Sequence, residues 1–298
     1  MTGRMRDTVR DGDSGQPTDA ERIERGDSPK QQRRIARERR QISARIVHEA
    51  IRFEGEEELD RPSAALFWSG LAAGLTMGLS LVAQGFLRVT VGNTPWGTVV
   101  ESFGYTLGFV FVVAGRQQLF TENTLTPVLP VLHDRSRLPA LARLWGIVLV
   151  ANLLGAFAFA WFAAATPAFD ATTQAAFLDV ARAVIAPTTL VLFLRAIVAG
   201  WLIALMVWLL PAAEHSRLAM IVLPTYLISL GGLTHSIAGS VDALYLVASG
   251  DAGWLEYFRF LSTAVVGNVI GGVVFVALLN HKQAVAGHDD HESPNDRR

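Results

Sequence analysis

His235 is the residue of this sequence whose type and position most directly suggest chemistry. It is the only one of seven histidines that lies within a long apolar stretch, and hydroxyl groups at Thr234 and Ser236 flank it. Glycines at Gly231 and Gly239 weaken helix continuity around it. Removal from water disfavours a charged imidazolium, whereas an anion beside the ring favours it. The imidazole is therefore expected to share or transfer a proton with a weak acid, or else only to hold the interrupted backbone by hydrogen bonding.

Motifs of the common catalytic and cofactor sites are missing from the sequence. It has no glycine-rich nucleotide loop followed by Lys, no paired catalytic carboxylates, no zinc-protease motif and no cysteine. His235 and Ser236 are neighbours, but they point differently on a helix and lack an orienting carboxylate. We therefore expect no enzyme activity, no cofactor, no metal site and no nucleic-acid partner.

Charge and hydropathy divide the chain into a charged N-terminal tail, an apolar body and a polar C-terminal tail. Residues 1–62 hold 14 of the 26 Lys and Arg and 14 of the 27 Asp and Glu, with few large apolar residues. Such a tail cannot bury enough surface to offset its ordering entropy. Between residues 63 and 281, several apolar runs reach the roughly 20 residues that a helix needs to cross a bilayer. The body therefore predicts an all-α polytopic protein in a lipid bilayer, followed by a disordered tail over residues 282–298.

Six apolar segments predict six membrane-spanning helices. The connections that hold "HDRSR" and "EHSR" lie on the same side as the Arg-rich tail, and those around "DATTQAAFLD" and "GDAGW" lie opposite. The positive-inside bias then places both termini in the cytoplasm, with the body in the inner (plasma) membrane. Residues 30–52 have isoleucines at helical spacing, which suits an amphipathic helix on the membrane or a solvated helix. The expected spans are Ser63–Leu87, Phe103–Leu132, Pro139–Ala164, Leu190–Leu210, Leu218–Val247 and Phe258–Leu279.

The second half of the body resembles the first. Asn152 and Asn268 are 116 residues apart, and a Gly follows each of them three positions later. Thr121 and His235 are 114 residues apart, which is nearly the same offset. Because each half has three spans, the halves must be inverted in the membrane, and 3+3 inverted repeats are typical of transporters and channels.

The second and fifth segments each contain a break, made by polar residues and prolines in one and by glycines in the other. Irregular backbone at membrane depth is tolerated only where it is buried in protein or lines a watery cavity. We expect two half-helices in each segment, the second ones beginning near Thr121 and Ser236. Their N-terminal ends carry partial positive charge and would together attract an anion.

These motifs resemble those of the formate/nitrite transporter family. The resemblance rests on "GRQQLFTENT", "LTHSIA" and the Asn-x-x-Gly pairs, and it covers about residues 63–281. It implies an aquaporin-like fold, a homopentamer and one substrate pore in each protomer. It also implies that Thr121 lies on a mobile loop, that His235 is the central pore histidine, and that Leu119 and Phe120 belong to an apolar constriction.

The sequence departs from the family pattern at several positions of the pore. Better-known members tend to have Glu before the pore histidine and an aromatic residue seven positions before it, where this chain has Thr234 and Ile228. Glu122 follows the loop threonine where Gly is usual, and Gly200 and Gly239 stand where Asn is frequent. The chain thus resembles a divergent branch, which leaves formate or nitrite open as the substrate.

Other polar residues are candidates for supporting roles. Arg143 matches a basic residue that the family often has at the start of the third span. Arg116 and Glu122 are expected to pair across the loop, or Arg116 attracts anions at a vestibule. Asn152 and Asn268 are expected to hydrogen-bond the loop backbones and hold them in register.

The sequence as a whole predicts a channel or transporter for small monovalent anions or their conjugate acids, with protons as a partner. A channel for water or another neutral solute is an alternative that Glu122 and Ile228 favour, and a non-transporting sensor or scaffold working through the tail is another. The expected pathway consists of His235, Thr121, Phe120, Leu119, Ile228, Thr234 and Ser236.

Overall fold

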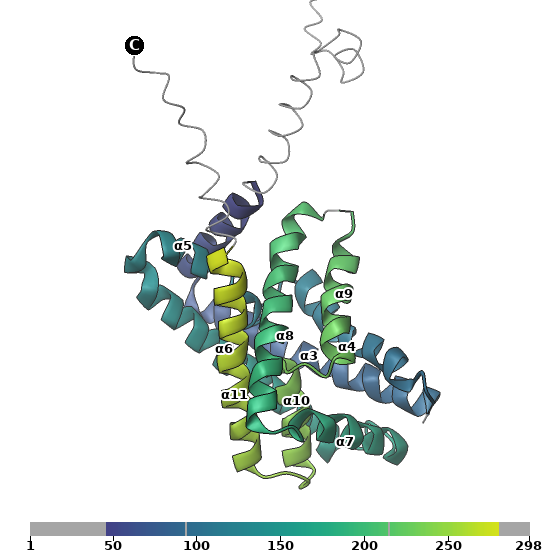
Figure 1. Ribbon diagram of the computed structural model, residues 1–298. Coiled ribbons are helices and arrows are strands. Elements are labelled where there is room, and N and C mark those ends of the chain that lie inside the picture. Colours follow the sequence, from purple (N-terminus) through teal and green to yellow (C-terminus); the bar gives the residue numbers. More distant parts are fainter. Residues whose placement is uncertain (1–45, 93, 214, 280–298) are drawn as a thin grey trace, which may run out of the picture. The chain divides into compact units, whose positions relative to one another are not determined.

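The regular elements of the described chain are all helices (Figure 1). This computed structural model describes residues 46–92, 94–213 and 215–279. Most of the helix expected over residues 30–52, and the tail over 282–298, lie outside the described residues, whereas residues 46–60 are helical. The long elements that follow are α3 (Ser63–Val91), α4 (Gly97–Ala114), α6 (Leu138–Ala165), α7 (Ala171–Ile185), α8 (Thr189–Leu209), α9 (Arg217–Leu230), α10 (Ser236–Ala248) and α11 (Trp254–Gly272).

Short helical pieces connect or extend these helices. The 3₁₀ turn η1 (Glu122–Thr124) and the short helix α5 (Val128–His133) follow α4, and η2 (Arg135–Arg137) leads into α6. The 3₁₀ turn η3 (Leu210–Ala212) extends α8, and the π-helical η4 (Val273–Leu278) extends α11.

Five of the described helical segments are long and apolar enough to cross a membrane. They are α3, α4, α6 together with η2, α8 together with η3, and α11 together with η4. The fifth predicted segment instead forms two shorter apolar helices, α9 and α10. The second predicted segment begins earlier than expected, because α4 starts at Gly97 rather than at Phe103.

Helix α7 lies in a region where the sequence suggested only a connection. Asp170 caps it by accepting a hydrogen bond from the backbone N–H of Thr173 at 2.7 Å. One face of α7 buries Phe177 completely, and α7 packs against α3 and α10. With only 15 residues and a polar outer face, α7 gives no signal of a membrane span.

Glycines bring the first and last helices of each half into close contact. A Cβ atom at Gly74 on α3 would overlap the backbone carbonyl of Asn152 on α6. A Cβ atom at Gly200 on α8 would likewise overlap the carbonyl of Asn268 on α11, and α8 and α11 lie side by side in Figure 1. The small residues at four-residue spacing therefore allow two helix backbones to touch.

Two interruptions of the helices share one backbone design. Helix α4 ends before Gly115 and α9 ends before Gly231, and the amides of residues 115–117 and 231–233 bond back to carbonyls of the preceding helix in the same pattern. The next residues, Arg116 and Gly232, adopt left-handed conformations with φ of 50° and 57°. Since these positions are 116 residues apart, the structural offset equals that between Asn152 and Asn268.

Candidate functional site

His235 and Thr121 are in contact although they come from different halves of the chain. The Nε2 atom of His235 lies 2.8 Å from the Oγ1 atom of Thr121. His235 is 2% exposed and Thr121 is fully buried. Both residues lie at the interruptions, Thr121 just before η1 and His235 just before α10, so the irregular backbone brings the two side chains together.

The hydrogen bonds of His235 define its tautomer. Its Nδ1 atom accepts a hydrogen bond of 3.1 Å from the backbone N–H of Ala238, which makes His235 the N-cap of α10. Because a backbone amide can only donate, Nδ1 carries no proton, and the neutral ring holds its proton on Nε2. The Nε2–H group therefore donates to Thr121, and a proton on Nδ1 would break the cap.

Two buried hydroxyl groups, one in contact with the imidazole and one on the next residue, can form further hydrogen bonds. The hydroxyl of Thr121 accepts from His235 and donates to no residue of the described chain. The Oγ atom of Ser236 is buried and lacks a partner among the described residues. Buried hydroxyls without partners are rare because each loses its bonds to water. Each of these hydroxyls can therefore donate a hydrogen bond to a small polar solute.

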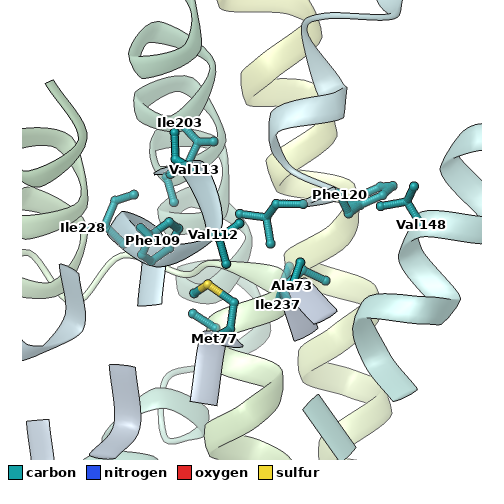
Figure 2. Close-up of a cluster of buried hydrophobic side chains, with 14 of the residues drawn as sticks. Ala73, Met77, Phe109, Val112, Val113, Phe120, Val148, Ile203, Ile228 and Ile237 are labelled. Carbon is teal, nitrogen blue, oxygen red and sulfur yellow. The ribbon is translucent and has the colours of Figure 1, made fainter. Parts of the chain in front are cut away.

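The surroundings of His235 are apolar. The ring of Phe109, on α4, contacts the imidazole edge to face, with centroids 5.0 Å apart. Ile228 and Leu119 are fully buried, and Figure 2 shows Phe109 and Ile228 in one buried cluster. Phe120 instead lies against Trp145 of α6, with ring centroids 6.0 Å apart. An ion without its hydration shell is costly in such surroundings.

Phe109 is a site residue that the sequence analysis did not identify. The family pattern has an aromatic residue at the position of Ile228 on α9, whereas in this chain the aromatic contact with His235 comes from α4. Phe109 lies one helical turn after Tyr105, and both are buried, so a helical face in the second segment carries the signal.

Asn152 and Asn268 clamp the two interruptions with matching hydrogen bonds. The Oδ1 atom of Asn152 accepts from the amide of Phe120 at 2.8 Å, and that of Asn268 accepts from the amide of Ser236 at 2.8 Å. The side-chain amide of Asn152 donates to Gly70 and Gln118 carbonyls. That of Asn268 donates in the same way to the carbonyls of Ala196 and Thr234.

Each half contains one arginine that hydrogen-bonds to the end of the helix preceding that half. Arg143, on α6, donates to the carbonyls of Leu59 and Arg61, next to the helix over residues 46–60. Arg259, on α11, donates to the carbonyls of Ile185, the last residue of α7, and of Pro187, just after α7. Arg259 lies 116 residues after Arg143, so the offset of the asparagines points to this second residue, which the sequence analysis missed.

The expected pairing of Arg116 with Glu122 is not formed. Arg116 is exposed, and its left-handed backbone belongs to the end of α4. Glu122 has no ion pair within the described chain, and its Oε1 atom is buried without a hydrogen-bond partner. The charges that act on Glu122 are Glu54, Glu58 and Arg217, from the helix over residues 46–60 and from α9.

Glu54, one of the groups that act on Glu122, is itself influenced by its neighbours. Desolvation raises the pKa of Glu54, the carboxylate of Glu58 raises it further, and Arg116 and Arg217 oppose the shift.

No group of three or more potential metal ligands occurs among the described residues.

The sequence that forms this arrangement matches a known family. A family model described as "Formate/nitrite transporter" matches residues 45–282. The chain belongs to the formate/nitrite transporter family. This match and the five long apolar helices make it a multi-pass membrane protein.

Several known proteins are similar to the chain in sequence or in fold. It is 44% identical to "Inner membrane protein YfdC" of Escherichia coli, over 80% of this chain and 78% of that protein. It is 26% identical to "Formate channel FocA" of Haemophilus influenzae, over 71% and 84% of the two chains. Among solved structures, a "Pentameric formate channel with formate bound" matches 75% of this chain and 98% of its own with a TM-score of 0.63 and 19% identity. An "FNT family ion channel" matches 80% and 98% with a TM-score of 0.69 and 18% identity. At these identities the structures establish the fold.

Proposed function

We propose that the chain forms a membrane channel or transporter for small monovalent anions or their conjugate acids. The observation that carries this proposal is the buried, hydrogen-bonded pair of His235 and Thr121 in apolar surroundings. The hydroxyls of Thr121 and Ser236 can each still donate a hydrogen bond. Relatives of the chain are named as formate channels, which supports a small carboxylate or a similar ion as the solute.

The proposed topology has six crossings in two inverted halves. In it, α4 with α5 forms one interrupted crossing, and α9 with α10 forms the other. The matching hydrogen bonds of Asn152 and Asn268 and of Arg143 and Arg259 support an internal repeat. With six crossings, both termini lie on one side, and the positive-inside bias favours the cytoplasm.

In the proposed mechanism, His235 is a fixed hydrogen-bond donor. Its Nε2–H group orients the hydroxyl of Thr121, which is then free to donate to an oxygen of the solute. The hydroxyl of Ser236 supplies a second donor. Apolar residues such as Phe109 and Ile228 favour the neutral acid over the ion, because desolvating a charge costs far more than desolvating an acid.

A homopentamer with a pathway in each protomer completes the proposal. Its support is the solved pentameric channel with the same fold. Helix faces with exposed apolar residues, such as Trp68 and Leu255, suit contact with lipid or with a neighbouring subunit.

A reconstituted flux assay with a matched variant tests this function. Purified protein in liposomes is expected to take up formate, nitrite or a related weak acid faster at acidic than at neutral pH. His235→Phe should abolish this uptake while the oligomer, measured by size-exclusion chromatography, survives. Flux of water alone, independent of pH and without competition by anions, would favour the neutral-solute channel. No flux of any small solute would favour the sensor or scaffold.

A further inference from the structure

Glu122 is an acidic residue next to the His235–Thr121 pair, and the proposed mechanism gives it no role. It follows Thr121 directly, so its backbone is fixed beside the hydroxyl that His235 orients. The residue is partly exposed, but its Oε1 atom is buried and lacks any hydrogen-bond partner in the described chain. Leaving a carboxylate oxygen in this state is costly, whereas a carboxylic acid tolerates it better.

Charged groups from two neighbouring helices act on Glu122. Helix 46–60 contributes Glu54 and Glu58, and the first residue of α9 contributes Arg217. None of these groups forms an ion pair with Glu122. Helices α8 and α11 also contact η1, but their charged residues, Arg195, Glu256 and Arg259, are not among the charges that act on Glu122.

Proton transfer along the pathway requires a group other than His235. The Nδ1 atom of His235 accepts from the amide of Ala238, and its Nε2–H group is engaged with Thr121. To accept a proton, the ring would have to give up the cap of α10. To donate its Nε2 proton, it would have to become an imidazolate. Among the titratable side chains of the described residues, Glu122 is the one adjacent in sequence to this pair.

We propose that Glu122 is the proton-exchanging residue of the pathway. The inference rests on the proposed function as a conduit for weak acids. An entering anion accepts the proton from the carboxylic acid of Glu122, so that an O–H bond breaks on Glu122 and one forms on the anion. The neutral acid then passes His235 and Thr121. Because Glu122 is partly exposed, its carboxylate can regain a proton from water, and the reverse sequence releases an anion.

Glu122→Gln tests this role, because glutamine keeps the shape and hydrogen-bonding capacity but cannot release a proton. Uptake of formate into liposomes is measured over an acid-to-neutral pH series. We expect uptake by this variant to fall about a hundredfold, the low end of what a positioned proton donor supplies, and to become independent of pH. Glu57→Gln removes an exposed carboxylate from helix 46–60 and is the matched control, with wild-type uptake and pH dependence expected.

Infrared difference spectroscopy of the same samples provides a readout that a structural role would not change. The carboxylic-acid band of Glu122 should appear on acidification of the wild type and be missing from Glu122→Gln. Glu122→Asp should restore pH-dependent uptake with a shifted midpoint. If the Gln variant fails to assemble, an unchanged midpoint in the Asp variant would overturn the proposal.

The outcomes separate this inference from the proposed function. Proton-linked uptake that persists in Glu122→Gln would overturn the role of Glu122 and leave the channel function standing. Wild-type protein that moves no weak acid would overturn the channel function, and the infrared titration would still decide whether Glu122 exchanges protons.

Discussion

Replacement of Asn268 by Ala should weaken the interruption between α9 and α10 by a predictable amount. The substitution removes the acceptor of the Ser236 amide at 2.8 Å and the donor to the Thr234 carbonyl at 2.9 Å. Ser236 is the first residue of α10, so its amide has no partner within the helix. The carbonyl of Ala196 also loses a hydrogen bond from Asn268, but this loss costs less because the carbonyl lies inside α8 and takes part in the helix. Two buried backbone groups without partners cost about 2–6 kcal/mol, with a centre near 4 kcal/mol.

Thermal melting of the detergent-solubilised oligomer, followed by tryptophan fluorescence, measures this loss. For a domain of this size a loss of 4 kcal/mol corresponds to a fall of roughly 10 °C in the melting temperature. Asn152→Ala should give a similar fall, because Asn152 makes the equivalent bonds to Phe120, Gly70 and Gln118. Asn268→Asp keeps an acceptor for the Ser236 amide and should lie between wild type and Asn268→Ala. A wild-type melting temperature for Asn268→Ala would refute the clamp.

The same melting assay tests two further predictions. Gly200→Ala places a methyl group against the backbone of Asn268 and should cost about 2 kcal/mol, whereas Gly146→Ala, where a Cβ meets no neighbour, should cost almost nothing; equal melting temperatures would contradict the close approach of the helices. Arg116→Gly should stabilise the protein by about 1 kcal/mol, because Arg116 adopts a left-handed conformation, and Gly232→Ala should destabilise it by a similar amount. A loss of stability in both would show that the charge of Arg116 outweighs its backbone strain.

The amino-acid sequence was sufficient to predict the parts of the fold that depend on composition. Long apolar runs mark the five helices that can cross a membrane, because lipid demands length and low charge. The length of apolar runs does not predict helix α7. Its apolar side chains cover one face only, and its stability depends on packing against α3 and α10. The contact of Phe109 with His235 is not predicted either, because any buried aromatic residue has the same local signature.

The repeat illustrates both the strength and the limit of sequence patterns. Matching Thr121 to His235 gave an offset of 114, whereas the backbone pattern at the interruptions recurs at 116. The offset of 114 is wrong because it pairs two polar side chains that touch each other, and such residues need not occupy equivalent positions of a repeat. The equivalent positions are instead those whose backbone amides Asn152 and Asn268 bind.

The two interruptions hold equivalent backbone amides but carry different side chains. At an offset of 116, the counterpart of His235 is Leu119, and each directly precedes the amide that an asparagine holds. Both asparagines fix backbone atoms, so the side chain before the held amide can change without loss of the clamp. One half can therefore present an apolar leucine and the other an imidazole on the same backbone. The imidazole of His235 then forms a hydrogen bond with Thr121, whereas the side chain at the equivalent position, Leu119, cannot form one.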